Sequence, residues 1–267
     1  MNKNLYFKEL KRNKKNLAIW TGIVIGFTLL VTSIFPYMAE MGDNITVLME
    51  SIPPEIGKAL GMDADTWSSI LGFYSTYYGV YIIVLVSIYT ASTATTIISK
   101  EEKDGTSEFL LTRPISRPTI VFSKIMALFT LSVIIFLIQT LTAYITVNIF
   151  AVNEVNWQVF AQMHFSGLIL ILFFSGVGVL LSMLLTPKKN FMGIVVGLTF
   201  GTYFLNAIGK SADAISWISY ISPFNYLEIS KNPEVAFNYI GAVVMMILAG
   251  LFIYIADKLY LKKDIAG

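Results

Sequence analysis

Residues 125–153 read IMALFTLSVIIFLIQTLTAYITVNIFAVN and contain no Lys, Arg, Asp or Glu. An α-helix rises about 1.5 Å per residue and the hydrocarbon core of a bilayer is about 30 Å thick, so about 20 apolar residues are enough to cross it. This uncharged run is long enough for one complete crossing. A membrane-spanning helix is therefore the first element that the sequence predicts.

Further uncharged stretches of similar length occur on both sides of this run. They are Leu17–Ala39, a span within 66–99, a span within 155–187, Asn190–Gly209 and Val235–Ala256. We therefore predict an all-α membrane protein with six transmembrane helices, built as a single domain over residues 1–267. Only Pro187, Lys188 and Lys189 separate the fourth and fifth spans. This short connection predicts that these two spans form an antiparallel helical hairpin.

The composition excludes several classes of protein. Hydrophobic residues make up 55% of the chain and charged residues only 13%, whereas a soluble domain carries roughly 25% charge. The formal net charge of +2 is too small to indicate a nucleic-acid partner. The chain has no cysteine, which excludes disulfides, thiolate metal sites and a cysteine nucleophile.

The positions of the basic residues predict the orientation in the membrane. If both termini are cytoplasmic, all but three of the 19 Lys and Arg lie on the cytoplasmic side, and the exceptions are Lys58, Lys210 and Lys231. Loops on the cytoplasmic side of membrane proteins carry an excess of Lys and Arg. We expect a multi-pass protein of the cell membrane, which would be the plasma membrane of a bacterium. Both termini would lie in the cytoplasm.

The outer connection between spans five and six, residues 210–234, contains an apolar and aromatic segment. This segment, Ala214–Leu227, is too short to span the bilayer, and Pro223 interrupts it. We predict an outer re-entrant region here, with a simple interfacial belt of aromatic side chains as the alternative.

The most informative connection follows the second span and covers residues 99–118. Residues 100–124 read KEEKDGTSEFLLTRPISRPTIVFSK. Ser99 and Glu102 have the spacing of a capping box, which predicts that a short cytoplasmic helix begins there. Pro114 would end this helix, and Ser116 would cap the third span. The helix would place apolar residues such as Phe109 on the watery side, where they either pack on their own bundle or the bilayer, or dock on a cytoplasmic partner.

These motifs resemble the ABC-2 type permease family. The resemblance rests on Glu-Glu-Lys-Asp-Gly-Thr at 101–106, Glu-Phe-Leu-Leu at 108–111, Arg-Pro-Ile-Ser-Arg at 113–117, Lys124, Ser-Pro-Phe at 222–224 and Tyr-Leu-Lys-Lys-Asp at 260–264. It covers the whole chain, and the sequence departs from the family pattern at Phe109, where leucine is usual. The overall pattern is also similar to bacterial phenol-soluble-modulin and bacteriocin-immunity exporters.

The resemblance implies a division of labour between this chain and a separate ATPase. The loop after the second span would be the coupling helix that contacts the ATPase, and residues 1–16 would form an amphipathic helix on the inner surface. The implied partners are a cytoplasmic ABC ATPase, which binds ATP and Mg, and a second permease copy or a related permease. The implied ATPase-coupling residues are Glu101, Glu102, Gly105, Thr106, Glu108, Phe109, Leu110 and Arg113.

The chain carries no catalytic or metal-binding motif of its own. Gly209-Lys210-Ser211 is the nearest approach to a phosphate-binding loop, but Phe204 stands at the required first glycine. The single histidine, His164, cannot by itself make a metal site. No Ser/His/Asp or His/Glu constellation falls at one membrane depth, which disfavours an intramembrane enzyme. We therefore expect no cofactor in this chain.

Polar and aromatic residues within the spans leave two interpretations open. Polar groups in spans tend to face the bundle interior, where they join helices or line a path. A tyrosine series at helical spacing on the second span would offer an amphipathic wall to cargo, or would serve packing alone. The candidate path residues are Tyr74, Tyr78, Tyr81, Gln139 and Asn206.

The predicted function is the permease half of an ATP-driven exporter. No span centre carries Asp, Glu, Lys or Arg, which disfavours a proton- or ion-driven carrier. The cargo would be lipophilic or amphipathic, for example a toxin or an antimicrobial peptide, and would leave the cell by alternating access. The alternative is a membrane anchor or envelope-assembly scaffold that transports nothing.

Overall fold

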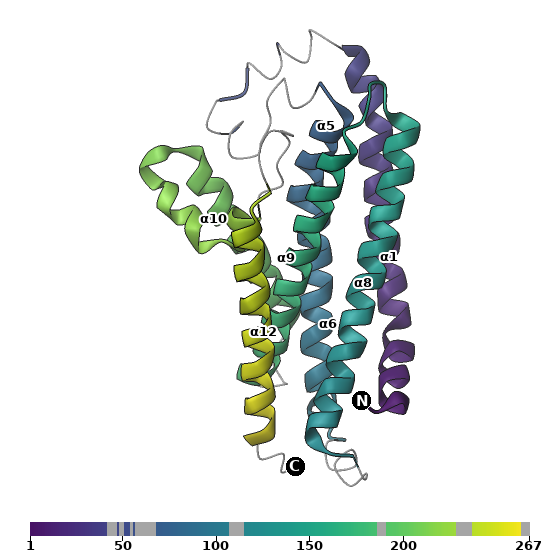
Figure 1. Cartoon of the computed structure of the whole chain (residues 1–267), viewed down its shortest axis with the longest axis vertical. Coiled ribbons are helices and arrows are strands. Elements are labelled where there is room, and N and C mark those ends of the chain that lie inside the picture. The colour runs from purple at the N-terminus through teal and green to yellow at the C-terminus, as the bar shows by residue number, and fades with distance from the viewer. Residues whose placement is uncertain are drawn as a thin grey trace.

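The computed structural model describes residues 1–41, 47, 51–53, 56, 68–106, 115–185, 191–227 and 237–262. These residues form helices and connections, with no strand among them. Six helical stretches in the described part of the chain are long and apolar enough to cross a membrane. The prediction of an all-α protein with six spans is confirmed, and Figure 1 shows the spans as a bundle.

The first span is one long helix, α1, Lys3–Met41. Asn2 caps it, because the Asn2 side-chain oxygen accepts a 3.0 Å hydrogen bond from the main-chain nitrogen of Leu5. The N-terminal segment is helical as predicted, but it is not a separate helix, since α1 continues through Asn16 without interruption. The reason lies in packing, because Leu5, Glu9 and Asn13 extend the buried face of the span.

The second span lies at the centre of the bundle and has three parts. They are α5 (Ile70–Tyr77), a π-helical segment η1 (Tyr78–Ile82) and α6 (Ile83–Lys103). In an 18-residue apolar stretch of this span, 83% of the residues are buried, compared with 22% in the corresponding stretch of α1. Its contacts reach α1, α8, α9 and α10. A segment surrounded in this way can shift only if its neighbours also move.

The third and fourth spans are α8, Arg117–Phe150, and α9, Trp157–Leu184. Ser116 precedes α8 in extended conformation and a proline stands in the first turn, which confirms the predicted start. The Ser116 side chain makes no capping hydrogen bond to the main chain, however, and its hydroxyl lies 2.9 Å from Thr119 Oγ1 instead. Asn156 caps α9 by accepting hydrogen bonds from two main-chain nitrogens. Helix α8 packs mainly on α1, whereas α9 packs on α6 and α12.

The fifth span, α10 (Phe191–Ser211), does not pack as predicted. It contacts α6 and the segment that follows it, whereas the main partners of α9 are α6 and α12 (Tyr239–Lys262). The predicted antiparallel hairpin of consecutive spans is therefore wrong as a packed pair. Close helix contact needs small residues on both sides, and the glycines of α9 serve α12 and α6 instead: Gly176 lies against Ala249, and Gly178 against Ala91.

The region between spans five and six contains two short helices. They are the 3₁₀ helix η2, Asp213–Ile221, and α11, Pro223–Tyr226. Ser222 separates them, and its side chain accepts a hydrogen bond from the main-chain nitrogen of Phe224. Helix η2 folds back on α10, and Figure 1 shows both (light green) projecting to one side of the bundle. Residues 228–234 of the predicted re-entrant region lie outside the described residues.

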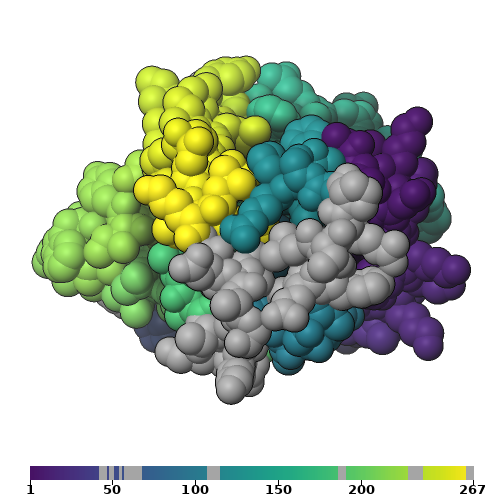
Figure 2. Space-filling view, turned by 90° about the horizontal axis from the view of Figure 1, so that it is seen from below, coloured from purple at the N-terminus to yellow at the C-terminus, as the bar shows by residue number. Residues whose placement is uncertain are grey.

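Both termini lie at the same end of the bundle, as an even number of spans requires (Figure 1). Figure 2 looks at this end, with α1 (purple) and α12 (yellow) on opposite sides. The long helices expose apolar side chains outward, among them Ile23, Leu141 and Ile247. Such a surface requires a lipid environment, and the chain is a multi-pass membrane protein.

Candidate functional site

Helix α6 ends at the loop that carries the family-like motif. Gly105 has a φ of 66°, the left-handed conformation that glycine adopts without strain and that commonly ends helices. The main-chain nitrogen of Thr106 donates a 2.8 Å hydrogen bond back to the main-chain oxygen of Glu101. The glycine in the motif is therefore the stop signal of the second span.

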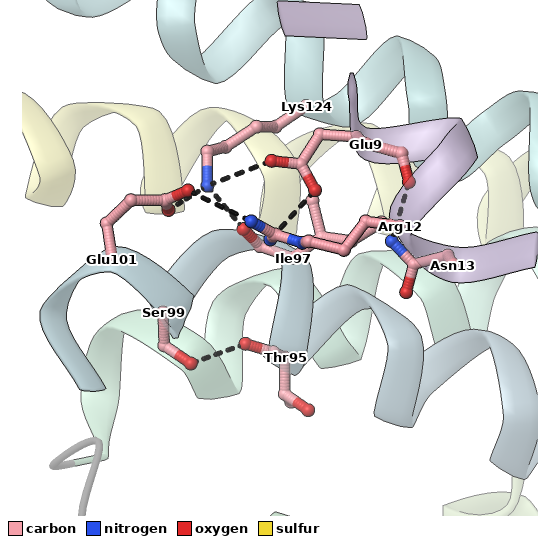
Figure 3. A network of polar contacts seen from close by, with 8 residues as sticks. All are labelled: Glu9, Arg12, Asn13, Thr95, Ile97, Ser99, Glu101 and Lys124. Carbon is pink, nitrogen blue, oxygen red and sulfur yellow. Dashed lines mark hydrogen bonds and ion pairs between the residues drawn. The ribbon is translucent and has the colours of Figure 1, made fainter. Parts of the chain in front are cut away.

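The predicted capping box at Ser99 is wrong. Ser99 is buried inside α6, and its hydroxyl donates a 2.6 Å hydrogen bond to the main-chain oxygen of Thr95, one turn earlier (Figure 3). The helix upstream is continuous, so Ser99 has no free main-chain nitrogens to cap. A serine that donates to the preceding turn is common within helices, and no helix begins at this position.

A cluster of four charged side chains lies at this end of the bundle (Figure 3). Lys124 of α8 donates a hydrogen bond to a carboxylate oxygen of Glu101 in α6. It also donates to the main-chain oxygen of Ile97, at a distance of 2.5 Å. The Lys124 Nζ also lies 3.8 Å from Glu9 of α1. Arg12 completes the cluster, at 2.8 Å from Glu9 and 3.5 Å from Glu101. We call these four side chains the ion cluster.

Three members of the ion cluster are buried, Arg12 is partly exposed, and the four formal charges balance. Glu9 is 0% exposed and Lys124 is 1% exposed. Removing single charges from water is costly, so each buried charge depends on its partners. A buried ion cluster adds little net stability, but it favours one arrangement of the helices over others. The four side chains therefore define how α1, α6 and α8 meet.

The cluster joins both ends of the loop to α1. Glu101 lies in the last turn of α6, and Lys124 lies two turns into α8. Further contacts bind the start of α1 to α8: the main-chain nitrogen of Asn2 donates to Ser123 Oγ at 2.8 Å, and the Tyr6 hydroxyl lies 2.9 Å from Thr130 Oγ1. A displacement of the loop would therefore act on three spans together.

A second polar cluster lies deep in the bundle, between α5, α8 and α9. Gln139 donates a 2.7 Å hydrogen bond to the Tyr74 hydroxyl, which lies 3.4 Å from Nε2 of His164. Nδ1 of His164 lies 2.9 Å from the main-chain oxygen of Phe160, so Nδ1 carries a proton and donates. Nε2 then accepts from Tyr74. The hydrogen bonds thus describe a neutral imidazole whose two nitrogens are both engaged.

Tyr78 packs beside this cluster without a hydrogen bond. Its ring centroid lies 4.7 Å from that of His164, and its hydroxyl is buried with no partner among the residues that the structure describes. Gly167 makes room for it, because a Cβ on that residue would lie 2.2 Å from the Tyr78 hydroxyl oxygen. Tyr78 is also the first residue of the π-helical segment, and such segments are frequent at functional sites.

A sequence model described as ABC-2 family transporter protein matches residues 4–264. The chain belongs to this family. ABC-2 proteins are the membrane permeases of ABC transporters, and membership implies association with an ABC ATPase. The match is to the family as a whole and does not distinguish phenol-soluble-modulin or bacteriocin-immunity exporters within it. No curated protein sequence matches the chain.

Four of the eight coupling residues expected for this ABC-2 permease lie among the residues that the structure describes. Glu101 is in the ion cluster, Glu102 is half-buried, and Gly105 and Thr106 are exposed at the end of α6. The other four expected residues, Glu108, Phe109, Leu110 and Arg113, lie outside the described residues.

The expected path residues of the permease divide into two groups. Tyr74, Tyr78 and Gln139 come together around His164, whereas Tyr81 is 46% exposed and packs on Phe27. Asn206 is buried in α10, and its Oδ1 has no partner among the described residues. The region that the structure describes contains no group of three His, Cys, Asp or Glu that could hold a metal ion.

Sequence reasoning gave no site role to Glu9, Arg12 or Lys124 of the ion cluster, although Lys124 was part of the family resemblance. All three looked like ordinary charges on the cytoplasmic side of a membrane protein. A signal existed for Lys124, because it is the only charged residue between Pro118 and Asn153. A lone charge inside an otherwise apolar helix usually has a buried partner.

Proposed function

We propose that this chain is the permease of an ABC exporter, and that a separate ATPase drives it through the loop between α6 and α8. The observation that carries the proposal is the ion cluster, because Glu101 and Lys124 flank that loop and bind each other. Force applied to the loop would reach α6 and α8 at once. Glu9 would pass the same movement to α1.

The proposed direction of transport is outward, with a lipophilic or amphipathic cargo. The spans carry no Asp, Glu, Lys or Arg at their centres, so the path suits an apolar or aromatic surface better than a free ion. The cluster of Tyr74, Gln139 and His164 offers hydrogen-bonding groups within an otherwise apolar bundle. A second copy of the chain, or a related permease, would complete the transporter.

Co-purification with an ATPase tests this function. The full chain is isolated from its native membrane in mild detergent, and co-purifying proteins are identified by mass spectrometry. We expect an ABC ATPase with the wild type and its loss with Phe109→Asp combined with Leu110→Asp in the loop. Val152→Asp, an exposed position between α8 and α9 at the other end of the bundle, is the matched control and should retain the ATPase.

The same experiment separates this function from its alternative. If an intact, monodisperse wild-type chain brings no ATPase, the exporter proposal fails and a non-transporting anchor or assembly scaffold takes its place. If the loop variant and Val152→Asp both keep the ATPase, the docking role of the loop is wrong.

A further inference from the structure

The N-terminal part of α1 separates its charged side chains between two faces. Glu9 and Arg12 belong to the ion cluster, where their charges are balanced against those of α6 and α8. The lysines of the same segment are all exposed. They are Lys3, Lys8, Lys11, Lys14 and Lys15, and we call them the lysine face.

The lysine face lies opposite the side of α1 that packs on the bundle. Glu9 and Asn13 are one turn apart and both are buried. Residues three and four apart share one face of a helix, so Lys11 and Lys14 line up with Ala18, which is also exposed. Ala18 already belongs to the transmembrane part of α1. The lysine face therefore continues directly into the lipid-exposed side of the first span.

The three lysines nearest the span lie at the edge of the bilayer. Lys15 stands just before the uncharged run that begins at Leu17. The side-chain nitrogen of Asn16 lies 3.5 Å from Thr93 Oγ1 of α6, and α6 stays uncharged for almost two further turns, until Lys100. This part of α1 is thus level with the last uncharged turns of α6. Lysine side chains at this depth can extend to the phosphate groups of the lipids.

These lysines have no acidic partner in the part of the chain that the structure describes. All the ion pairs between described residues lie within the ion cluster. The other acidic residues described at this end are Glu102 and Asp104 in the last turns of α6 and Asp257 in α12. Figure 2 shows α12 (yellow) across the bundle from α1 (purple). An exposed group of like charges favours a ligand of opposite charge.

We propose that Lys11, Lys14 and Lys15 bind the phosphate groups of anionic phospholipids in the leaflet at this end of the bundle. In the predicted orientation this is the inner leaflet. Lysines beside a membrane span are attracted to anionic lipids, and the attraction falls off within a Debye length of about 10 Å. Lys3 lies about 12 Å further along the helix axis than Lys11, because a helix rises about 1.5 Å per residue. The outer lysines, Lys3 and Lys8, therefore contribute less. The proposal does not depend on the proposed function.

A single fluorescent probe reports which lipids gather beside α1, because the chain has no cysteine of its own. Ala18→Cys is labelled with bimane, and the full chain is placed in zwitterionic nanodiscs. Small and equal mole fractions of phosphatidylglycerol or phosphatidylcholine are included, both with the same doxyl-labelled acyl chain. We expect the phosphatidylglycerol to quench the bimane several-fold more strongly than the phosphatidylcholine. High salt should reduce this preference.

Leu251→Cys carries the same probe on the opposite side of the bundle and is the matched control. Leu251 is 45% exposed in α12 and lies within two turns of Asp257 and Lys258, whose formal charges cancel. The two doxyl lipids should quench this probe to a similar extent.

Substitutions in two parts of the lysine face test which charges bind the lipid. Changing Lys11, Lys14 and Lys15 together to glutamine should make the two lipids equal at the α1 probe. Changing Lys3 and Lys8 to glutamine should keep most of the preference. Changing the three inner lysines to arginine retains their charge and should also retain the preference.

Two results would overturn the proposal. One is equal quenching of the α1 probe by both lipids with the native lysines in place. The other is a preference that survives the triple glutamine substitution. Co-purification of the ATPase is measured on the same variants. Loss of the ATPase with an unchanged lipid preference would assign the lysine face to an acidic surface of the ATPase instead.

Discussion

Gly178 of α9 lies so close to Ala91 of α6 that a Cβ on the glycine would be 2.4 Å from the main-chain oxygen of the alanine. Two main chains in contact without intervening side chains are a common way for membrane helices to associate, because lipid offers no hydrophobic force to bring them together. Helix α9 contacts α12 in the same way, since Gly176 of α9 lies against the main chain of Ala249 in α12. The glycines of α9 therefore hold the central helix and the last span together.

Gly178→Ala should destabilise the bundle by about 1–3 kcal/mol, because the added methyl group forces α6 and α9 apart. The measurement is thermal unfolding of the purified chain in detergent. Gly197→Ala on α10 is the control, since a Cβ there meets nothing within 4 Å. It should leave the unfolding temperature unchanged or raise it slightly, because alanine favours the helix over glycine. Equal effects of the two substitutions would contradict the close packing.

Lys124→Met should destabilise the protein by about 3–5 kcal/mol, because it leaves the buried carboxylates of Glu9 and Glu101 with Arg12 as their only cation in the ion cluster. Adding Glu101→Gln to Lys124→Met removes one of these carboxylates and should restore part of the loss. A double-mutant cycle on thermal stability measures this coupling. Strictly additive effects would show that the two side chains do not act as a pair.

Much of this fold follows from simple sequence patterns, and its exceptions have physical reasons. The spans were predictable because hydropathy and length alone decide whether a helix can cross a bilayer. The misreading of Ser99 arose because a capping box has meaning only where a helix begins, and the continuous α6 supplies no such start. The partners of α10 were unpredictable, because proximity in sequence does not show which faces are complementary.

The ion cluster was hidden from the sequence for a related reason. Glu9 and Lys124 are separated by more than a hundred residues, and their pairing depends on α1 continuing straight from its N-terminus into the span. Only Glu101 was predicted, and from the family resemblance alone. The polar cluster was partly predictable: the tyrosine spacing indicated Tyr74 and Tyr78. The sequence does not show that the Tyr74 hydroxyl is bonded while the Tyr78 hydroxyl has no partner among the described residues.

Tyr78→Phe and Tyr74→Phe should have opposite effects, although both remove one buried hydroxyl. The Tyr78 hydroxyl has no partner in the described part of the chain, so its removal should leave stability unchanged or increase it. The Tyr74 hydroxyl links Gln139 to His164, and its loss should cost about 1–3 kcal/mol by leaving both without this partner. Thermal unfolding of the two variants checks the difference. A stabilised Tyr74→Phe would show that the three groups do not form the chain of hydrogen bonds described.

The absence of cysteine from the chain allows a direct test of its orientation in the membrane. Single cysteines are placed at Lys103, exposed at the end of α6, and at Val152, exposed between α8 and α9 at the opposite end of the bundle. Because the basic residues favour cytoplasmic termini, a membrane-impermeant maleimide should label Val152→Cys in intact cells. Lys103→Cys should react only after permeabilisation. Cysteine-free wild type is the control for background, and the reverse pattern would place the ion cluster on the outer face, where no cytoplasmic ATPase could reach it.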